Sequence, residues 1–171
     1  VLLARASGYA TLRMVDKGMA DVDAVAAELG EDELATWAHV EMIRGELKGT
    51  AGATSGAVEA LEHAIALWRE LGDTAAQAKT MRLLGMTYLY SGDNVAAERW
   101  LSEALDAVRA LGDRQGEGWA LQKRARLSYH QGRLDEAAEP LDAADATAKQ
   151  TGRFGGLGAV RGRRGGFRGP D

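Results

Sequence analysis

The feature that most limits the fold of this chain is a repeat of 40 residues. The triplet Leu-Gly-Asp occupies residues 71–73 and 111–113, and Thr-Gly-Arg occupies residues 151–153. Two helix-length segments, separated by Ser-Gly-Asp at residues 91–93, lie between the first two triplets. The next period repeats this layout around Gln-Gly-Arg at residues 131–133. A fixed period of this length indicates stacked helical hairpins.

The second helix-length segment of each period carries a stripe of apolar or small residues. The residues of the stripe follow one another at intervals of 4, 3, 4 and 3 positions, a spacing that places them on one face of an α-helix. Because one hairpin cannot bury such a face alone, we expect neighbouring hairpins to cover it. The stripes are Ala57, Leu61, Ala64, Trp68 and Leu71; Ala97, Leu101, Ala104, Val108 and Leu111; and Ala137, Leu141, Ala144, Ala148 and Thr151.

The pattern predicts an all-α solenoid of stacked antiparallel helical hairpins. Gly18 is expected to interrupt the chain between the first two helices, and Gly30 to end the second one. Asp73 and Asp93 are expected to cap the helices that follow them, and Pro140 to bend the last helix. The predicted helices are residues 2–14, 19–29, 33–48, 57–71, 74–90, 94–111, 114–130 and 134–150.

This reading divides the chain into three regions. Residues 1–32 form a degenerate helical pair, and residues 33–153 form three repeats at 33–73, 74–113 and 114–153. The third repeat should pack less well, because Arg124 stands where Leu84 stands and Ser128 where Tyr88 stands. Residues 154–171 contain four arginines and many glycines; this composition opposes a packed helix and predicts a disordered tail.

Composition and motifs point away from catalysis. The chain has no cysteine and a net charge of −4. Residues 154–171 hold four arginines and one acid, so the remaining residues are acidic as a whole and would repel nucleic acid. It contains no phosphate-binding loop, no dinucleotide fingerprint and no serine nucleophile elbow. Neither the spacing of His39, His63 and His130 nor that of the carboxylates indicates a metal pair. We therefore expect no enzyme activity, no cofactor and no metal; no apolar run has membrane-spanning length.

The repeat resembles the tetratricopeptide repeat family in a longer form of about 40 residues. The resemblance covers residues 33–153 and rests on one set of small and apolar positions in each repeat. The repeat is also similar to repeat blocks of large bacterial signalling and transcriptional regulators. The matching positions are Leu84, Gly85, Tyr88, Gly92, Ala97, Leu101 and Ala104 in the middle repeat, Gly45, Gly52, Ala57, Leu61 and Ala64 before it, and Ala125, Gly132, Ala137, Leu141 and Ala144 after it.

The resemblance implies a protein–protein interaction scaffold of the cytoplasm. Since the chain begins at Val1 rather than Met, we expect a fragment of a larger regulator. One alternative is the regulatory region of a multidomain ATPase, nucleotide cyclase or transcriptional regulator whose catalytic or DNA-binding domain lies elsewhere. Another is RNA binding through the arginine–glycine tail. The last repeat would be left uncapped, which predicts self-association.

A partner is expected in the concave groove, which the first helix of each repeat lines in such solenoids. Basic and apolar side chains dominate this set, of types enriched in interfaces. The sequence therefore predicts a peptide partner that carries an acidic residue beside an apolar one. The predicted groove residues are His39, Met42 and Glu46; Lys79, Arg82, Met86 and Tyr90; and Trp119, Gln122, Arg126 and His130.

Overall fold

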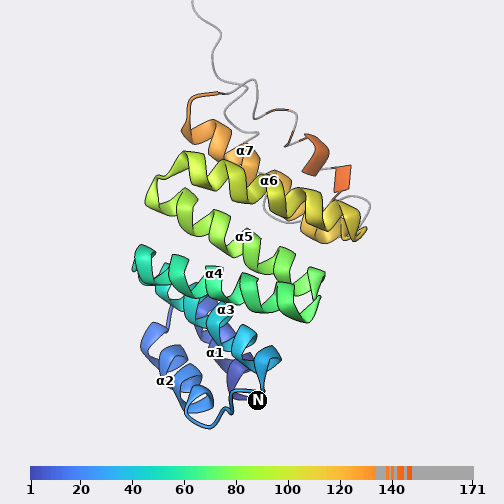
Figure 1. The fold of residues 1–171 in the computed structure, drawn as a ribbon. Coiled ribbons are helices and arrows are strands. Elements are labelled where there is room, and N and C mark those ends of the chain that lie inside the picture. Colours follow the sequence, from blue (N-terminus) through green and yellow to red (C-terminus); the bar gives the residue numbers. More distant parts are fainter. Residues whose placement is uncertain (134–137, 139, 141, 145, 148–171) are drawn as a thin grey trace, which may run out of the picture.

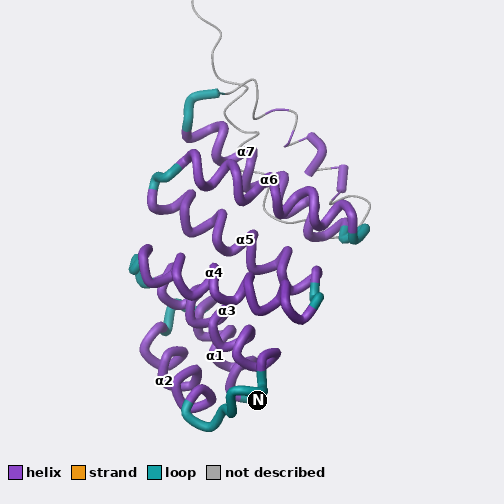
Figure 2. The backbone as a smooth tube through the Cα atoms, in the orientation of Figure 1, coloured by secondary structure: helices purple, strands orange, loops and turns teal. Residues whose placement is uncertain are grey.

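The computed structural model describes residues 1–133 and, beyond them, residues 138, 140, 142–144, 146 and 147. This described part contains α-helices and no β-strand, which confirms the predicted all-α class (Figure 2). The helices are α1 (Leu2–Thr11), α2 (Val15–Ala26), α3 (Leu34–Thr50), α4 (Thr54–Leu71), α5 (Thr74–Ser91), α6 (Asn94–Ala110) and α7 (Arg114–His130).

The helices stack as successive antiparallel hairpins (Figure 1). Each helix packs on its neighbour in the chain, and α3 also contacts α5, as α5 contacts α7. Within the described residues α4 and α6 make no such contact with each other. The first helices of the hairpins therefore lie closer together than the second helices, as in a solenoid that curves toward its first helices.

A glycine opposite a leucine brings the two helices of a hairpin close together. A Cβ on Gly45 would lie 2.5 Å from Leu61 Cγ, and one on Gly85 would lie 2.9 Å from Leu101 Cγ. Both leucines are fully buried. The stripe prediction is confirmed for these two leucines, but its last members Leu71 and Leu111 are 41% and 43% exposed, because they lie at the turns between successive hairpins.

The turns between helices repeat every 20 residues. A glycine with positive φ occupies the same place in each turn, where a side chain would be strained. Three aspartates follow these glycines and cap the next helix: Asp73 accepts from Ala76 N at 2.9 Å, Asp93 from Ala96 N at 3.0 Å and Asp113 from Gly116 N at 2.8 Å. The glycines are Gly52, Gly72, Gly92, Gly112 and Gly132.

The N-terminal pair differs from its prediction. The first helix ends at Thr11 and α2 begins at Val15, so Gly18 lies inside a helix instead of between two. Gly18 is buried, and a Cβ there would lie 2.5 Å from Leu47 Cδ2 of α3. This glycine permits close packing rather than breaking the chain. The helix then ends at Ala26, before the predicted stop at Gly30.

The described residues after α7 continue the third repeat. Residues 138, 140, 142–144, 146 and 147 are helical, and Ala144 is buried with Leu105 of α6 and Leu121 of α7. The remainder of the predicted helix 134–150, the bend expected around Pro140 and the tail 154–171 lie outside the described residues. Among the described helices, none is long and apolar enough to cross a membrane.

Candidate functional site

The predicted partner-binding residues lie on the first helices of the three hairpins, α3, α5 and α7. We call the surface that they share the first-helix face. Of the predicted set, His39, Lys79, Tyr90, Arg126 and His130 are exposed, whereas Glu46, Arg82, Met86, Trp119 and Gln122 are half-buried.

One group of contacts joins Arg82 of α5 to Trp119 of α7. The Arg82 guanidinium carbon lies 5.2 Å from the centre of the Trp119 ring, within the range of a cation–π contact. Arg82 Nη1 also lies 4.0 Å from Oδ2 of Asp113, the residue that caps α7. Burial lowers the pKa of the Arg82 guanidinium, and the Asp113 carboxylate raises it. Arg82 is therefore compensated by an acid of its own chain.

A second group joins the far ends of the same two helices. The Arg126 guanidinium carbon lies 5.2 Å from the centre of the Tyr90 ring, and Arg126 Nη1 donates to Tyr90 Oη at 3.4 Å. One turn further along α7, His130 Nε2 lies 3.4 Å from Arg126 Nε. Tyr90 is 57% exposed, so its ring is available to a partner while it still positions Arg126.

Lys123 belongs to this face but is missing from the predicted set. Its ammonium nitrogen lies 5.1 Å from the centre of the Trp119 ring, which places Lys123 and Arg82 against the same indole. Burial lowers the pKa of Lys123, and the charge of Arg126 lowers it further. The 40-residue period aligns Lys123 with Leu83, a partly buried residue that packs on the core. The alignment therefore predicts a buried position for Lys123 and leaves it out of the partner-binding set. A lysine at a position that is apolar in the preceding repeat could have indicated a surface residue.

On α3 the face carries an acid. Burial raises the pKa of Glu46 above its ordinary value, and the neighbouring Lys79 ammonium lowers it. Lys79 of α5 therefore acts electrostatically on Glu46 of α3. The first-helix face therefore carries an acid and a base near α3 and α5 and is basic over α7.

Two residues of α3 do not join these contacts. Met42 is 4% exposed and lies in the core formed with α1 and α2, so its placement on the binding surface is wrong. The physical reason is that the N-terminal pair covers α3 more fully than the sequence suggested. His39 stays exposed, but its ring packs edge-on against Trp68 of α4, with ring centres 4.7 Å apart. Gln122 and Met86 lie on α7 and α5 between the two contact groups.

The chemistry available on the first-helix face is recognition by charge and by aromatic rings. Cations held over indole and phenol rings present fixed positive charge beside apolar surface. Across the described residues, no group of three or more His, Asp or Glu side chains could hold a metal ion.

Comparison with protein families identifies the repeat. The family model described as tetratricopeptide repeat matches residues 45–110, so these residues are tetratricopeptide repeats, as the resemblance implied. The match begins within α3 and ends with α6. It thus stops before the repeat in which Arg124 and Ser128 replace apolar residues. A search of curated proteins finds none that matches this chain.

Two solved structures share the fold. Aspartyl phosphate phosphatase F from Bacillus subtilis superposes with a TM-score of 0.78 at 11% identity, over 88% of this chain and 40% of that one. BtubC (BKLC) from P. vanneervenii superposes with a TM-score of 0.69 at 18% identity, over 98% of this chain and 83% of that one. At such low identities the likeness concerns the fold alone. The chain spans well under half the length of the phosphatase.

Proposed function

We propose that these tetratricopeptide repeats form a protein-interaction scaffold that binds an acidic peptide on the first-helix face. The observation that carries the proposal is the pair Lys123 and Arg126 on α7. The described residues offer neither of them an acidic partner within ion-pair distance, while Tyr90 and Trp119 hold both in place.

The electrostatics of the pair favour an external carboxylate. Lys123 and Arg126 lie three positions apart on one helix, where like charges repel. Burial lowers the pKa of Lys123, and the charge of Arg126 lowers it further. Arg82 differs, because Asp113 lies 4.0 Å from it, and Lys79 lies near enough to Glu46 to lower the pKa of that carboxyl. A carboxylate between Lys123 and Arg126 would relieve the repulsion, which is why we place the acidic residue of the partner there.

Apolar surface beside this pair supplies the second element of recognition. The exposed Tyr90 ring and the half-buried Trp119 ring flank the two cations, and the half-buried Met86 lies on α5 between the two contact groups. Aromatic side chains and methionine are enriched where proteins bind one another. The preferred ligand is therefore a segment in which an aspartate or glutamate adjoins an apolar residue.

The test is selection of peptides by display on the intact chain, followed by titration of the selected peptides. We expect acidic residues beside apolar ones, and affinity that falls as salt is added. Reversing both charges, Lys123→Glu with Arg126→Glu, should weaken binding by about tenfold or more. Arg82 is left unchanged, since reversing its charge would oppose Asp113 and disturb the α7 cap.

A matched control changes the same net charge on the second helices. Arg69→Glu with Arg99→Glu alters exposed arginines of α4 and α6, away from the first-helix face. This control should retain peptide affinity if binding depends on local contacts. If both double variants lose affinity equally, binding reflects net charge alone. If neither loses affinity while helical content is unchanged, the first-helix face is not the binding site.

We also propose that the scaffold is the interaction region of a larger cytosolic regulator. This follows from the resemblance to repeat blocks of bacterial regulators. Sequencing the gene on both sides of the coding segment tests it directly. A continuous reading frame into an ATPase, cyclase or DNA-binding domain is the expected result, and stop codons on both sides would contradict it.

A further inference from the structure

The connection between α2 and α3, residues 27–33, is acidic, and we call it the acidic loop. Residues 18–43 contain seven acids and neither lysine nor arginine. Three of these acids, in α2 and α3, pair with Arg5 or Arg44. The other four lie in the loop, are exposed, and make no ion pair within the described part of the chain. They are Glu28, Glu31, Asp32 and Glu33.

The acidic loop is held in shape by hydrogen bonds and by packing. Gly30 N donates to Glu33 Oε2 at 3.0 Å, and Trp37 Nε1 donates to Gly30 O at 3.0 Å. The half-buried side chains of Leu29 and Leu34 pack against the core that α3 shares with α1 and α2. The loop therefore presents its acids in a fixed arrangement beside apolar residues, which lowers the entropic cost of binding them.

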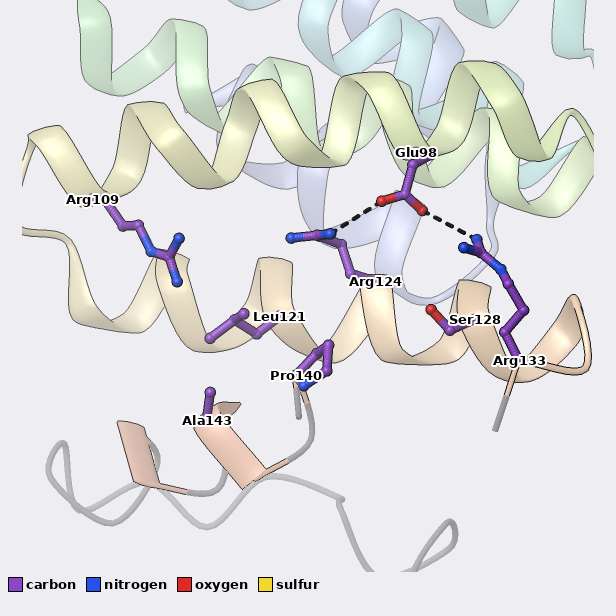
Figure 3. Close-up of a pocket in the computed structure, with 8 residues that line it drawn as sticks. All are labelled: Glu98, Arg109, Leu121, Arg124, Ser128, Arg133, Pro140 and Ala143. Atoms are coloured by element: carbon purple, nitrogen blue, oxygen red, sulfur yellow. Dashed lines mark hydrogen bonds and ion pairs between the residues drawn. The ribbon is translucent and has the colours of Figure 1, made fainter. Parts of the chain in front are cut away.

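On the side of α7 that packs on α6, the positive charges are paired. Figure 3 shows Glu98 of α6 between Arg124 and Arg133, at 3.2 Å and 3.8 Å. Another arginine, at the start of α7, is paired with an acid one turn along the same helix. Lys123 and Arg126 have no such acid among the residues that the structure describes. The unpaired positive charge of α7 therefore lies on the first-helix face.

The acidic loop does not reach α7 of its own chain. In Figure 1, α2 lies at one end of the stack of helices and α7 lies near the other. Among the described helices, α7 contacts only α5 and α6. A contact between the acidic loop and the first-helix face over α7 therefore has to join two copies of the chain.

We propose that a second copy of this chain binds to the first-helix face through its acidic loop. The inference rests on the proposed function and identifies the acidic partner as the loop of another copy. In the contact, the carboxylates of Glu31 and Asp32 pair with Lys123 and Arg126. Charges that have no partner in their own chain gain one in the neighbour, which favours this pairing over others. Because the two surfaces differ, the contact is head-to-tail and continues from copy to copy.

The first measurement is the weight-average mass of the full chain against concentration, by sedimentation equilibrium at low and at high salt. We expect the mass to rise beyond that of a dimer at low salt, and added salt to reverse this rise. Association through an apolar end of the last repeat would persist at high salt, since salt screens charges and does not weaken apolar burial. A mass that is independent of salt at every concentration would overturn the proposal.

Two variants separate the two surfaces. The loop variant is Glu31→Gln with Asp32→Asn, and it keeps Glu33, which accepts from the loop backbone. The face variant is Lys123→Gln with Arg126→Gln. Each variant alone should associate about tenfold or more weakly at low salt. An equimolar mixture should form a one-to-one complex that grows no further, because one variant supplies only the loop and the other only the face. Absence of that complex would refute the head-to-tail contact.

A matched control removes the same number of acids from the second helices. Glu70→Gln with Asp106→Asn changes exposed residues of α4 and α6 that make no ion pair within the described residues. This control should associate as the unmodified chain does. If it loses as much association as the loop variant, net charge governs association and the acidic loop has no specific role.

The peptides selected on the first-helix face distinguish this inference from the proposed function. They should compete with self-association, because both occupy Lys123 and Arg126. If the peptides bind there and the chain shows no salt-sensitive rise in mass, the second copy is not the partner and the proposed function stands. If the face variant loses neither peptide binding nor self-association, both proposals fail.

Discussion

Substitutions at the contact of Gly85 with Leu101 test how the hairpins pack. Alanine at an open glycine in the middle of a helix stabilises a protein by about 1 kcal/mol. At Gly85 the added methyl would meet Leu101 Cγ and Cδ2 at 2.9 Å and the Leu101 backbone nitrogen at 3.2 Å. Overpacking of a core costs about 1–3 kcal/mol. Gly85→Ala should therefore lower the free energy of unfolding by about 0–2 kcal/mol, the difference of the two effects.

Substitution of Leu101, alone and together with Gly85→Ala, completes a double-mutant cycle. Leu101 is fully buried, so Leu101→Ala should cost about 2–5 kcal/mol. In the double variant the new methyl at residue 85 occupies part of the space that Leu101 vacates. The two costs should thus fall short of additivity by about 0.5–3 kcal/mol, as for residues in direct contact.

Gly8 provides the matched control. It lies inside α1, and a Cβ built there meets nothing within 4 Å. Gly8→Ala should raise the free energy of unfolding by up to about 1 kcal/mol. The assay is urea unfolding followed by circular dichroism, with the slope checked for each variant. If Gly85→Ala stabilises as much as Gly8→Ala, or if the double variant is additive, the close contact is not present in solution.

Three further predictions concern charge and assembly. The raised pKa of Glu46 means that the folded state keeps this proton to higher pH than the unfolded state does, so the free energy of unfolding should fall as pH rises through that raised pKa. Glu46→Gln should remove this fall. Parallel curves of unfolding free energy against pH for the two proteins would contradict the prediction. Asp113→Ala should lower the free energy of unfolding more than Asp73→Ala does, as measured by urea unfolding. Each variant loses a helix cap that contributes about 0.5–2 kcal/mol, but only Asp113 also pairs with Arg82. Equal losses would show that this pair adds nothing to stability. The isolated chain should self-associate through its last repeat, and a monomer at high concentration in light scattering would argue against that.

The helical repeat was predictable from sequence because the residues that end one helix and begin the next act locally. A glycine recurs every 20 residues in each turn, and an aspartate after three of them caps the next helix. These signals set the ends of α5 and α7 to within a residue of the predicted 74–90 and 114–130. No long-range information was needed for them.

The N-terminal pair was harder to predict because its key signal depends on tertiary packing. Gly18 is a helix breaker by propensity, yet here it admits Leu47 of α3 against the backbone of α2. Sequence alone does not distinguish a glycine that ends a helix from one that allows a close crossing. The same packing of α1 and α2 buries Met42 and removes it from the first-helix face.

The candidate site was predictable in outline and incomplete in detail. The period correctly assigned Arg82, Tyr90, Trp119 and Arg126 to helices that contact each other. It left out Lys123, because the aligned residue Leu83 is apolar and partly buried. Repeat alignment transfers burial from one repeat to the next, and it fails where one repeat exchanges an apolar residue for a charged one.

The indole N–H signals of the four tryptophans test the central claim most directly. Trp119 alone is among the first-helix-face residues; Trp37 bonds to Gly30 O at 3.0 Å, Trp68 is buried, and Trp100 lies beside Arg99. In a nitrogen–proton correlation spectrum, assigned with Trp119→Phe, a selected acidic peptide should shift the Trp119 signal and leave those of Trp37 and Trp68 in place. A bound peptide that shifts Trp37 or Trp100 while Trp119 is unmoved would contradict binding on the first-helix face.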